Sequence, residues 1–275
     1  MRRHLQGIDH VVIVVRDLDK AQRAYARMGF TLTPRGFHTL GSQNHCLMFG
    51  SDYVELLAVP VHHPANRHYA EFLQRGEGLA GLAFATDDAA GLHAGLAAEG
   101  IAAGEPLDFS RPVEGLGEAR FRITTLPAEA TPGLNSFACQ HFTPGLVWRP
   151  EYQRHANGAT ALAAMAVIAE DPSAAAARYA TLIGTLPRRI AEGQLVEAGS
   201  TPIAITSRGK LGRRLRNVAL PPRPRPVAAA LFVRVADRAT TAKSLRRNGL
   251  APVALADGSC AIGADQAHGV AVVFG

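Results

Sequence analysis

Apolar residues recur along this chain in short runs, and the first run begins a pattern that later returns. Residues 8–15 form an apolar run rich in β-branched residues, which is typical of a buried strand. Asp17 or Asp19 can cap a following helix whose apolar residues fall at helical spacing, and Gly29 ends it. Three strand-like segments follow, separated by turns that contain glycine: 30–34, 44–49 and 53–59. The pattern predicts the order β-α-β-β-β.

The same order returns in a second copy that starts at Gly78. It is offset by 71 residues, so that Asp88 corresponds to Asp17 and Gly100 to Gly29. Its strands are expected at four places: 79–86, 104–109, 119–125 and 135–142. A repeat at a fixed offset indicates one supersecondary unit used twice.

Two further copies begin with the apolar segments 162–169 and 228–235. Because one such unit cannot enclose a core alone, four copies indicate two pairs, joined by a linker at 150–157. We therefore predict an α+β fold of tandem βαβββ modules. The four modules would form two domains, at 1–150 and 151–275.

Composition agrees with a large, ordered protein. The chain has 275 residues, of which 47% are hydrophobic and 19% are charged, so it can bury a sizeable core. Its apolar runs are short, which argues against a membrane partner, and the first residues do not resemble a signal peptide. We therefore expect a cytoplasmic protein. The three cysteines are far apart and odd in number, so no disulfide framework is implied, and we expect Cys46 and Cys260 to be reduced, buried thiols.

The net charge of +6 is concentrated in residues 208–225. Such a stretch could bind nucleic acid, but no aromatic residues are interleaved with its arginines, and the prolines at 221, 222, 224 and 226 make the connection stiff. We interpret it as a solvated linker and expect no nucleic-acid partner.

Particular residues make the first modules similar to a known family. Residues 7–13 read Gly-Ile-Asp-His-Val-Val-Ile and precede the capped helix, and residues 53–57 read Tyr-Val-Glu-Leu-Leu. Both resemble strands of the vicinal-oxygen-chelate superfamily, which includes glyoxalases, bleomycin-resistance proteins and extradiol dioxygenases. Segments 44–50 and 139–150 resemble its glyoxalase-like subgroup. The resemblance implies an open cup of strands with metal ligands on the first and last strands of each module.

His10 and Glu55 fall at those ligand positions in the first module. His10 lies inside an apolar strand, and Glu55 faces opposite to Val54 and Leu56. A buried carboxylate must be paired or bound to a metal. The two residues therefore predict a metal site, with a direct His–Glu hydrogen bond as the alternative.

The second module departs from the family pattern. The offset places Gly81 where His10 stands, so this ligand is missing, and His141 is the best third ligand. His10, Glu55 and His141 would suit a divalent ion, with zinc, nickel, iron and manganese not distinguished, and possibly none bound. His141 could instead be a surface or pocket histidine at the end of a strand. Ala164 and Ala230 stand at the equivalent positions of the later modules, which should not bind metal in this way.

Other polar residues could serve the same site. Glu55 or the neighbouring His45 could move a proton. Asn44 could reach substrate, and Arg111 and Arg149 could each hold a substrate carboxylate. Arg111 could also be a solvated turn residue.

Together these features predict a metal-dependent enzyme of the lyase or isomerase type, acting on a small oxygenated organic molecule. A non-catalytic binding protein, like the drug-sequestering members of the superfamily, is the alternative. An extradiol-type dioxygenase is disfavoured because Gly81 removes one of the histidines that such enzymes need. The expected partner is a small molecule, and a homodimer is possible.

Overall fold

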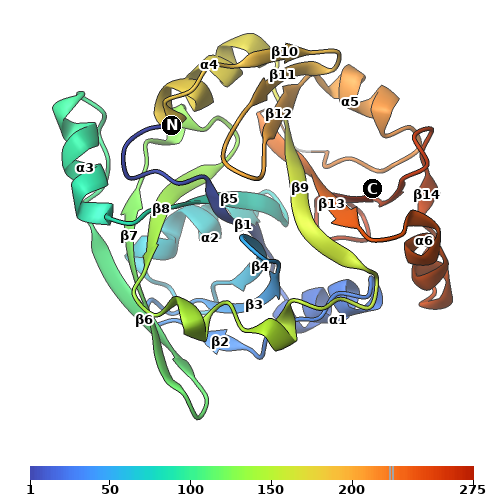
Figure 1. The fold of residues 1–275 in the computed structure, drawn as a ribbon, viewed down its shortest axis with the longest axis horizontal. Helices are drawn as coiled ribbons and strands as arrows, with labels where there is room; N and C mark the ends of the chain where they lie inside the picture. The colour runs from blue at the N-terminus through green and yellow to red at the C-terminus, as the bar shows by residue number, and fades with distance from the viewer. Residues whose placement is uncertain (223, 225) are drawn as a thin grey trace.

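The computed structural model describes residues 1–222, 224 and 226–275 (Figure 1). Arg223 and Arg225, part of the predicted basic linker, lie outside the described residues. The first half contains these helices and strands: β1 (Ile8–Val14), α1 (Leu18–Arg27), β2 (Gly36–Phe37), β3 (Gln43–Met48), β4 (Tyr53–Ala58), α2 (Arg67–Gln74), β5 (Gly78–Ala85), α3 (Ala89–Ala98), β6 (Leu107–Val113), β7 (Gly117–Thr125) and β8 (Asn135–His141).

The second half repeats this order. It contains these helices and strands: β9 (Ala159–Ile168), α4 (Pro172–Ile183), β10 (Arg188–Ile190), β11 (Gly193–Val196), β12 (Ile203–Thr206), α5 (Arg208–Arg214), β13 (Val227–Val235), α6 (Arg238–Arg247), β14 (Val253–Ala254), β15 (Cys260–Ile262) and β16 (Ala271–Phe274). The strands form two eight-stranded sheets, ordered β2-β3-β4-β1-β5-β8-β7-β6 and β10-β11-β12-β9-β13-β16-β15-β14. The predicted α+β fold of tandem βαβββ modules is confirmed.

The first helix of each module begins after an aspartate, as the repeat predicts. The carboxylates of Asp17, Asp88 and Asp237 each accept the backbone N–H of the residue three positions on, and Asp171 accepts two such N–H groups. Each cap satisfies N–H groups that have no partner within the helix.

The strand predicted at 30–34 is wrong, because β2 lies at Gly36–Phe37 instead. Thr33 still faces Cys46, whose carbonyl accepts the Thr33 N–H (3.0 Å). The Thr33 carbonyl, however, accepts from the His45 ring (2.7 Å), and Pro34 has no N–H to give. The ladder therefore breaks at Pro34 and resumes two residues later.

The first sheet curls until its two edges meet. The Thr39 N–H, just beyond β2, donates to the Ser110 carbonyl of β6 (2.9 Å), and the Ser110 N–H donates to Thr39 Oγ1 (3.2 Å). The concave face is thus enclosed within one chain, and no second copy is needed to complete it.

The concave face of the second sheet is covered by the chain itself. Helix α5 falls within the stretch predicted as a solvated linker, and that prediction is wrong for residues 208–214. Leu211, Leu215 and Val218 are buried there against small residues such as Ala230. Apolar contact, rather than the basic side chains, decides where this segment lies.

The two sheets share one hydrophobic cluster, which contains residues from both. Tyr25 on α1 donates its hydroxyl to the Ala267 carbonyl (3.1 Å), and Phe30 stacks on Phe274 with ring centroids 5.8 Å apart. Because the halves are packed through a common core, the division into domains at 1–150 and 151–275 stays a prediction.

Candidate functional site

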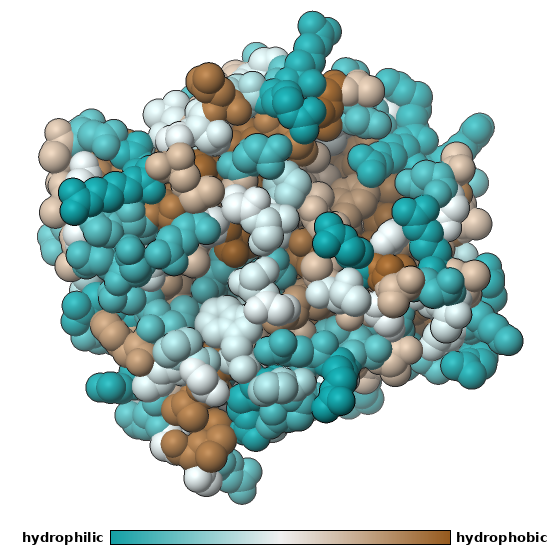
Figure 2. Space-filling view, in the orientation of Figure 1, coloured by the Kyte–Doolittle hydropathy of each residue, from teal (hydrophilic) through white to brown (hydrophobic). Residues whose placement is uncertain are grey.

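A cavity of about 430 Å³ lies on the concave face of the first sheet, and its described lining residues all lie between His10 and Val147. One wall is apolar and carries aromatic and aliphatic side chains: Leu107, Phe109, Phe121, Ile123 and Phe137. Figure 2 shows one face of the molecule, which is mainly hydrophilic with separate apolar patches. The cavity combines its apolar wall with polar side chains, among them His10, Asn44 and Glu55.

His10 and Glu55 meet on the cavity wall because β1 and β4 pair in parallel with Val12 opposite Glu55. Their side chains lie on the same face, with His10 Nε2 and Glu55 Oε2 3.7 Å apart. The His10 ring stacks on Tyr53, with centroids 4.3 Å apart, and Phe137 meets it edge-on. Both polar side chains are buried.

Asp9, which is not among the site residues predicted from the sequence, lies behind His10. The register between β1 and β5 shifts between Ile8 and His10, so Asp9 is the extra residue of a bulge. A bulge turns a side chain away from strict alternation, and Asp9 consequently lies on the same side as His10. Its Oδ1 is 2.5 Å from His10 Nδ1.

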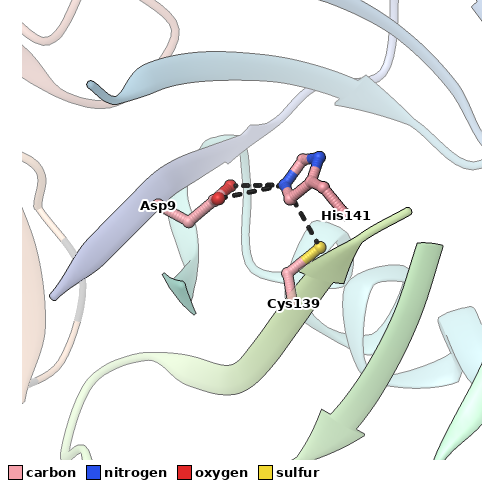
Figure 3. A group of neighbouring side chains, drawn as sticks. All are labelled: Asp9, Cys139 and His141. Atoms are coloured by element: carbon pink, nitrogen blue, oxygen red, sulfur yellow. Dashed lines mark hydrogen bonds and ion pairs between the residues drawn. The ribbon is translucent and has the colours of Figure 1, made fainter. Parts of the chain in front are cut away.

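The Asp9 carboxylate also pairs with His141 from β8, whose Nε2 lies 3.0 Å from Oδ2 and 3.2 Å from Oδ1 (Figure 3). Burial raises the pKa of Asp9, but hydrogen bonds from His10 and His141 outweigh it and lower the pKa to about 2. Asp9 is therefore an ionised carboxylate that joins two histidines.

Cys139 completes the group drawn in Figure 3. Its Sγ is 3.6 Å from His141 Nε2, and the ligand atoms of Asp9, Cys139 and His141 all lie within 4.8 Å of one another. Among the described residues this is the group that could hold a metal by that spacing. The three predicted ligands, His10, Glu55 and His141, do not form such a group. Burial, together with the charges of Asp9 and Glu55, raises the pKa of the Cys139 thiol well above its ordinary value.

The position of the proton on the His141 ring decides whether His141 donates to Asp9 or is available to a metal. Within the described part of the chain, His141 Nδ1 is buried without a hydrogen-bond partner, and so is Nε1 of the neighbouring Trp148. An Nε2–H donated to Asp9 leaves Nδ1 an acceptor beside an indole donor. A metal on Nε2 would instead leave Nδ1–H as a second unpaired donor, which costs about 1–3 kcal/mol when buried. The geometry favours His141 as a donor to Asp9.

Glu55 is held on its other oxygen by Asn44, whose Nδ2 donates to Oε1 (2.6 Å). The same amide nitrogen lies 3.4 Å from Nε2 of His38, which the sequence reading did not select. Burial lowers the pKa of His38 to about 4, so this histidine is neutral at physiological pH. Nothing in the local sequence distinguished His38 from any other turn histidine.

The second module lacks residues equivalent to His10 and Glu55 of the first module. Val12 corresponds to Ala83, which lies opposite Phe137 just as Val12 lies opposite Glu55. Phe137 therefore stands in place of the carboxylate, as Gly81 stands in place of the histidine. A Cβ built on Gly81 would lie 2.7 Å from the hydroxyl oxygen of Tyr69. The hydroxyl from α2 occupies the space that a second-module ligand would need.

Arg111 lies within β6 rather than in a turn, because β6 extends to Val113. It faces the cavity, whereas three other predicted residues, His45, Arg149 and His141, do not line it. His45 points to the opposite side of β3 and hydrogen-bonds the Thr33 carbonyl. Arg149 pairs with Glu151 and lies over the Tyr152 ring, 5.3 Å from its centroid. The structure thus brings together Glu55, Asn44, His10 and Arg111, and not His45 or Arg149.

The repeat contains a sequence pattern that could have identified Asp9 as a functional residue. The bulge positions of the four first strands are occupied by Asp9, Ala80, Ala163 and Ala229. Three alanines and one aspartate at equivalent positions would have marked Asp9, had the bulge been recognisable.

Comparison with known proteins places these features in context. The family described as "Glyoxalase-like domain" matches residues 8–183. A hypothetical protein from Staphylococcus aureus has a similar structure, with a TM-score of 0.71, 12% identity and coverage of 98% of each chain. A mutant of 4-hydroxymandelate synthase from Streptomyces coelicolor gives a TM-score of 0.58 at 14% identity, over 90% of this chain and 76% of that one. These likenesses concern the fold.

Two further comparisons support no inference about this chain. A methylmalonyl-CoA epimerase from Mycobacterium tuberculosis is 22% identical over 51% of this chain and 91% of its own, with a TM-score of 0.41. No curated protein matches the chain. None of the helices in the described residues is long and apolar enough to cross a bilayer.

Proposed function

Because this chain belongs to the glyoxalase-like family of the vicinal-oxygen-chelate superfamily, we propose that it is a metal-dependent enzyme of the lyase or isomerase type. Its substrate would be a small oxygenated organic molecule held in the cavity of the first sheet. The observation that carries this proposal is the pair of His10 Nε2 and Glu55 Oε2, 3.7 Å apart on the cavity wall.

The chemistry of this pair fits a divalent ion. With Nδ1–H donated to Asp9, His10 presents the Nε2 lone pair toward Glu55. Histidine ligands regularly donate their other N–H to a carboxylate in this way. Bond lengths of about 2.0–2.2 Å to each donor allow a separation of up to about 4 Å. Imidazole nitrogen and carboxylate oxygen suit zinc, nickel, iron and manganese alike.

We assign His141 a supporting role rather than the third ligand position. It donates to Asp9, which in turn orients His10. The centre would then have two protein ligands and would hold its ion more loosely than sites with three or four. The remaining positions would be open to substrate oxygens and water.

A bound divalent ion would supply a Lewis acid that stabilises negative charge on substrate oxygens. The chain supplies the surroundings. Asn44 fixes Glu55 through Oε1, and the apolar wall excludes water. Glu55 is the buried carboxylate on this wall and the candidate to accept a proton from a bound substrate. His45 is not proposed for that role, because it faces the opposite side of β3.

A binding protein without catalysis is the second candidate. It is favoured by Phe137 and by the Tyr69 hydroxyl, which take the places of the second module's ligands. That function would give saturable ligand binding in protein stripped of metal, with no turnover. The cytoplasmic location and the homodimer expected from the sequence stay predictions.

The test is metal binding by the purified full-length chain. Metal content and titrations with Zn²⁺, Mn²⁺, Ni²⁺ and Fe²⁺ would be compared for wild type, His10→Ala and Glu55→Gln. We expect both variants to lose metal affinity by at least about tenfold, or 1.4 kcal/mol. Glu105→Gln is the matched control, since this carboxylate also lines the cavity but is largely exposed.

A second pair of variants locates the ion. Cys139→Ser should leave metal affinity nearly unchanged if the ion lies at His10 and Glu55. If Cys139→Ser abolishes binding while Glu55→Gln does not, the ion occupies the group of Figure 3 instead. Wild type that binds none of the four ions would refute the enzyme proposal and leave the binding protein.

A further inference from the structure

The cavity contains a guanidinium that no carboxylate among the described residues pairs with. The Arg111 guanidinium makes no hydrogen bond or ion pair with the other described residues, and Arg111 is the one lysine or arginine among the described lining residues. On the neighbouring strand, Arg122 is bound by Asp108 through two contacts of 2.6 and 2.8 Å. A half-buried cation without a partner favours an anionic ligand.

The local structure directs Arg111 into the cavity. A Cβ built on Gly36 would lie 3.0 Å from Arg111 Cδ and 2.3 Å from Asn44 Oδ1. Only glycine leaves room for the arginine stem to pass beside Asn44, whose amide holds Glu55. The missing side chain at Gly36 therefore lets the Arg111 guanidinium reach the polar end of the cavity.

The wall beside it is suited to a flat apolar group. Phe109 and Phe121 are stacked with centroids 4.9 Å apart and planes 19° apart, and Ile123 and Phe137 continue the surface. A volume of about 430 Å³ lies in the range of small-molecule sites. A single guanidinium near Glu55 favours a monoanion, because a dianion such as a phosphate monoester would leave one charge unpaired.

We propose that the cavity binds a monocarboxylic acid with an apolar, ring-sized body, its carboxylate paired with Arg111 and its body against Phe109 and Phe121. This rests on the proposed function only in taking the cavity as the substrate site. It does not depend on a metal ion. The planar fork of arginine matches a carboxylate through two parallel hydrogen bonds.

The experiment is calorimetric titration of the full-length, EDTA-treated chain with phenylacetate, phenylacetamide and inorganic phosphate. Phenylacetamide has the same shape without the charge, and phosphate has the charge without the ring. We expect phenylacetate to bind at least about tenfold more tightly than either. Arg111→Met should remove that preference, whereas Arg149→Met should keep it, because Arg149 lies outside the cavity lining.

Arg111→Lys is the control for a folding defect. It keeps the positive charge and should restore part of the preference for phenylacetate. The proposal is overturned if Arg111→Met leaves phenylacetate affinity unchanged, or if the amide binds as well as the acid. It is also overturned if phosphate competes equally, or if no phenylacetate binding is seen up to about 10 mM. Because these titrations are made in EDTA, their outcome is independent of the metal titrations of His10→Ala and Glu55→Gln, so this inference and the proposed function can fail separately.

Discussion

Asp52 is a buried carboxylate at the contact between the two sheets, and it should weaken the protein at neutral pH. It is 1% exposed, and Oδ2 accepts the hydroxyl of Thr201 (2.9 Å). Within the described residues, its Oδ1 is buried without a partner. Burial raises the pKa of Asp52 to about 6, and the hydrogen bond from Thr201 only partly opposes it.

Replacing Asp52 by asparagine removes the buried charge and keeps an oxygen for Thr201. A pKa raised from 3.8 to about 6 corresponds to about 3 kcal/mol of unfavourable free energy for the ionised form. The new amide N–H₂ would take the place of the unpartnered Oδ1, at a cost of about 1–2 kcal/mol. The net expectation is that Asp52→Asn stabilises the protein by about 1–2 kcal/mol at pH 7.5.

The sign of the pH dependence follows from the raised pKa. The folded protein binds this proton more tightly than the unfolded chain, so the contribution of Asp52 to stability falls as pH rises from about 4 to about 6 and is level above that. The advantage of the variant should therefore grow across this window.

Urea unfolding of both proteins at pH 4.5, 6 and 7.5 measures the difference, with Asp265→Asn as an exposed control. A difference that does not change with pH, or a variant less stable than wild type at pH 7.5, would refute the reasoning.

Two further substitutions test other parts of the structure. Asp9→Asn should lower the free energy of unfolding by about 2 kcal/mol, because the amide is uncharged and its N–H₂ would replace one of the two oxygens that accept from His10 and His141. Urea unfolding at pH 7.5 measures this, and a change under about 0.5 kcal/mol would contradict the bridging role. Leu211→Ala should cost about 2–5 kcal/mol, because Leu211 on α5 is 2% exposed and packs in the core of the second half. It should leave phenylacetate binding unchanged, and a matching loss of ligand affinity would show that the halves are coupled.

The sequence predicted the features that depend on local periodicity. Alternation and helical spacing located the βαβββ repeats, and the aspartate before each module's helix proved to be its cap. Alternation along β4 also put Glu55 on the face opposite Val54, where it meets His10. These features are set by residues within one element, so a single chain of letters contains them.

The remaining features depend on contacts between distant segments. Alternation would have placed Asp9 away from His10, and only the pairing of β1 with β5 forms the bulge that brings them together. The Tyr69 hydroxyl lies over Gly81 because α2 packs across the first sheet. Arg111 faces a cavity because the edges of that sheet meet. The sequence by itself determined the modules and the first pair of polar residues. The tertiary structure decided which further side chains surround them, because those distances are set by strand register and sheet closure, which no local pattern records.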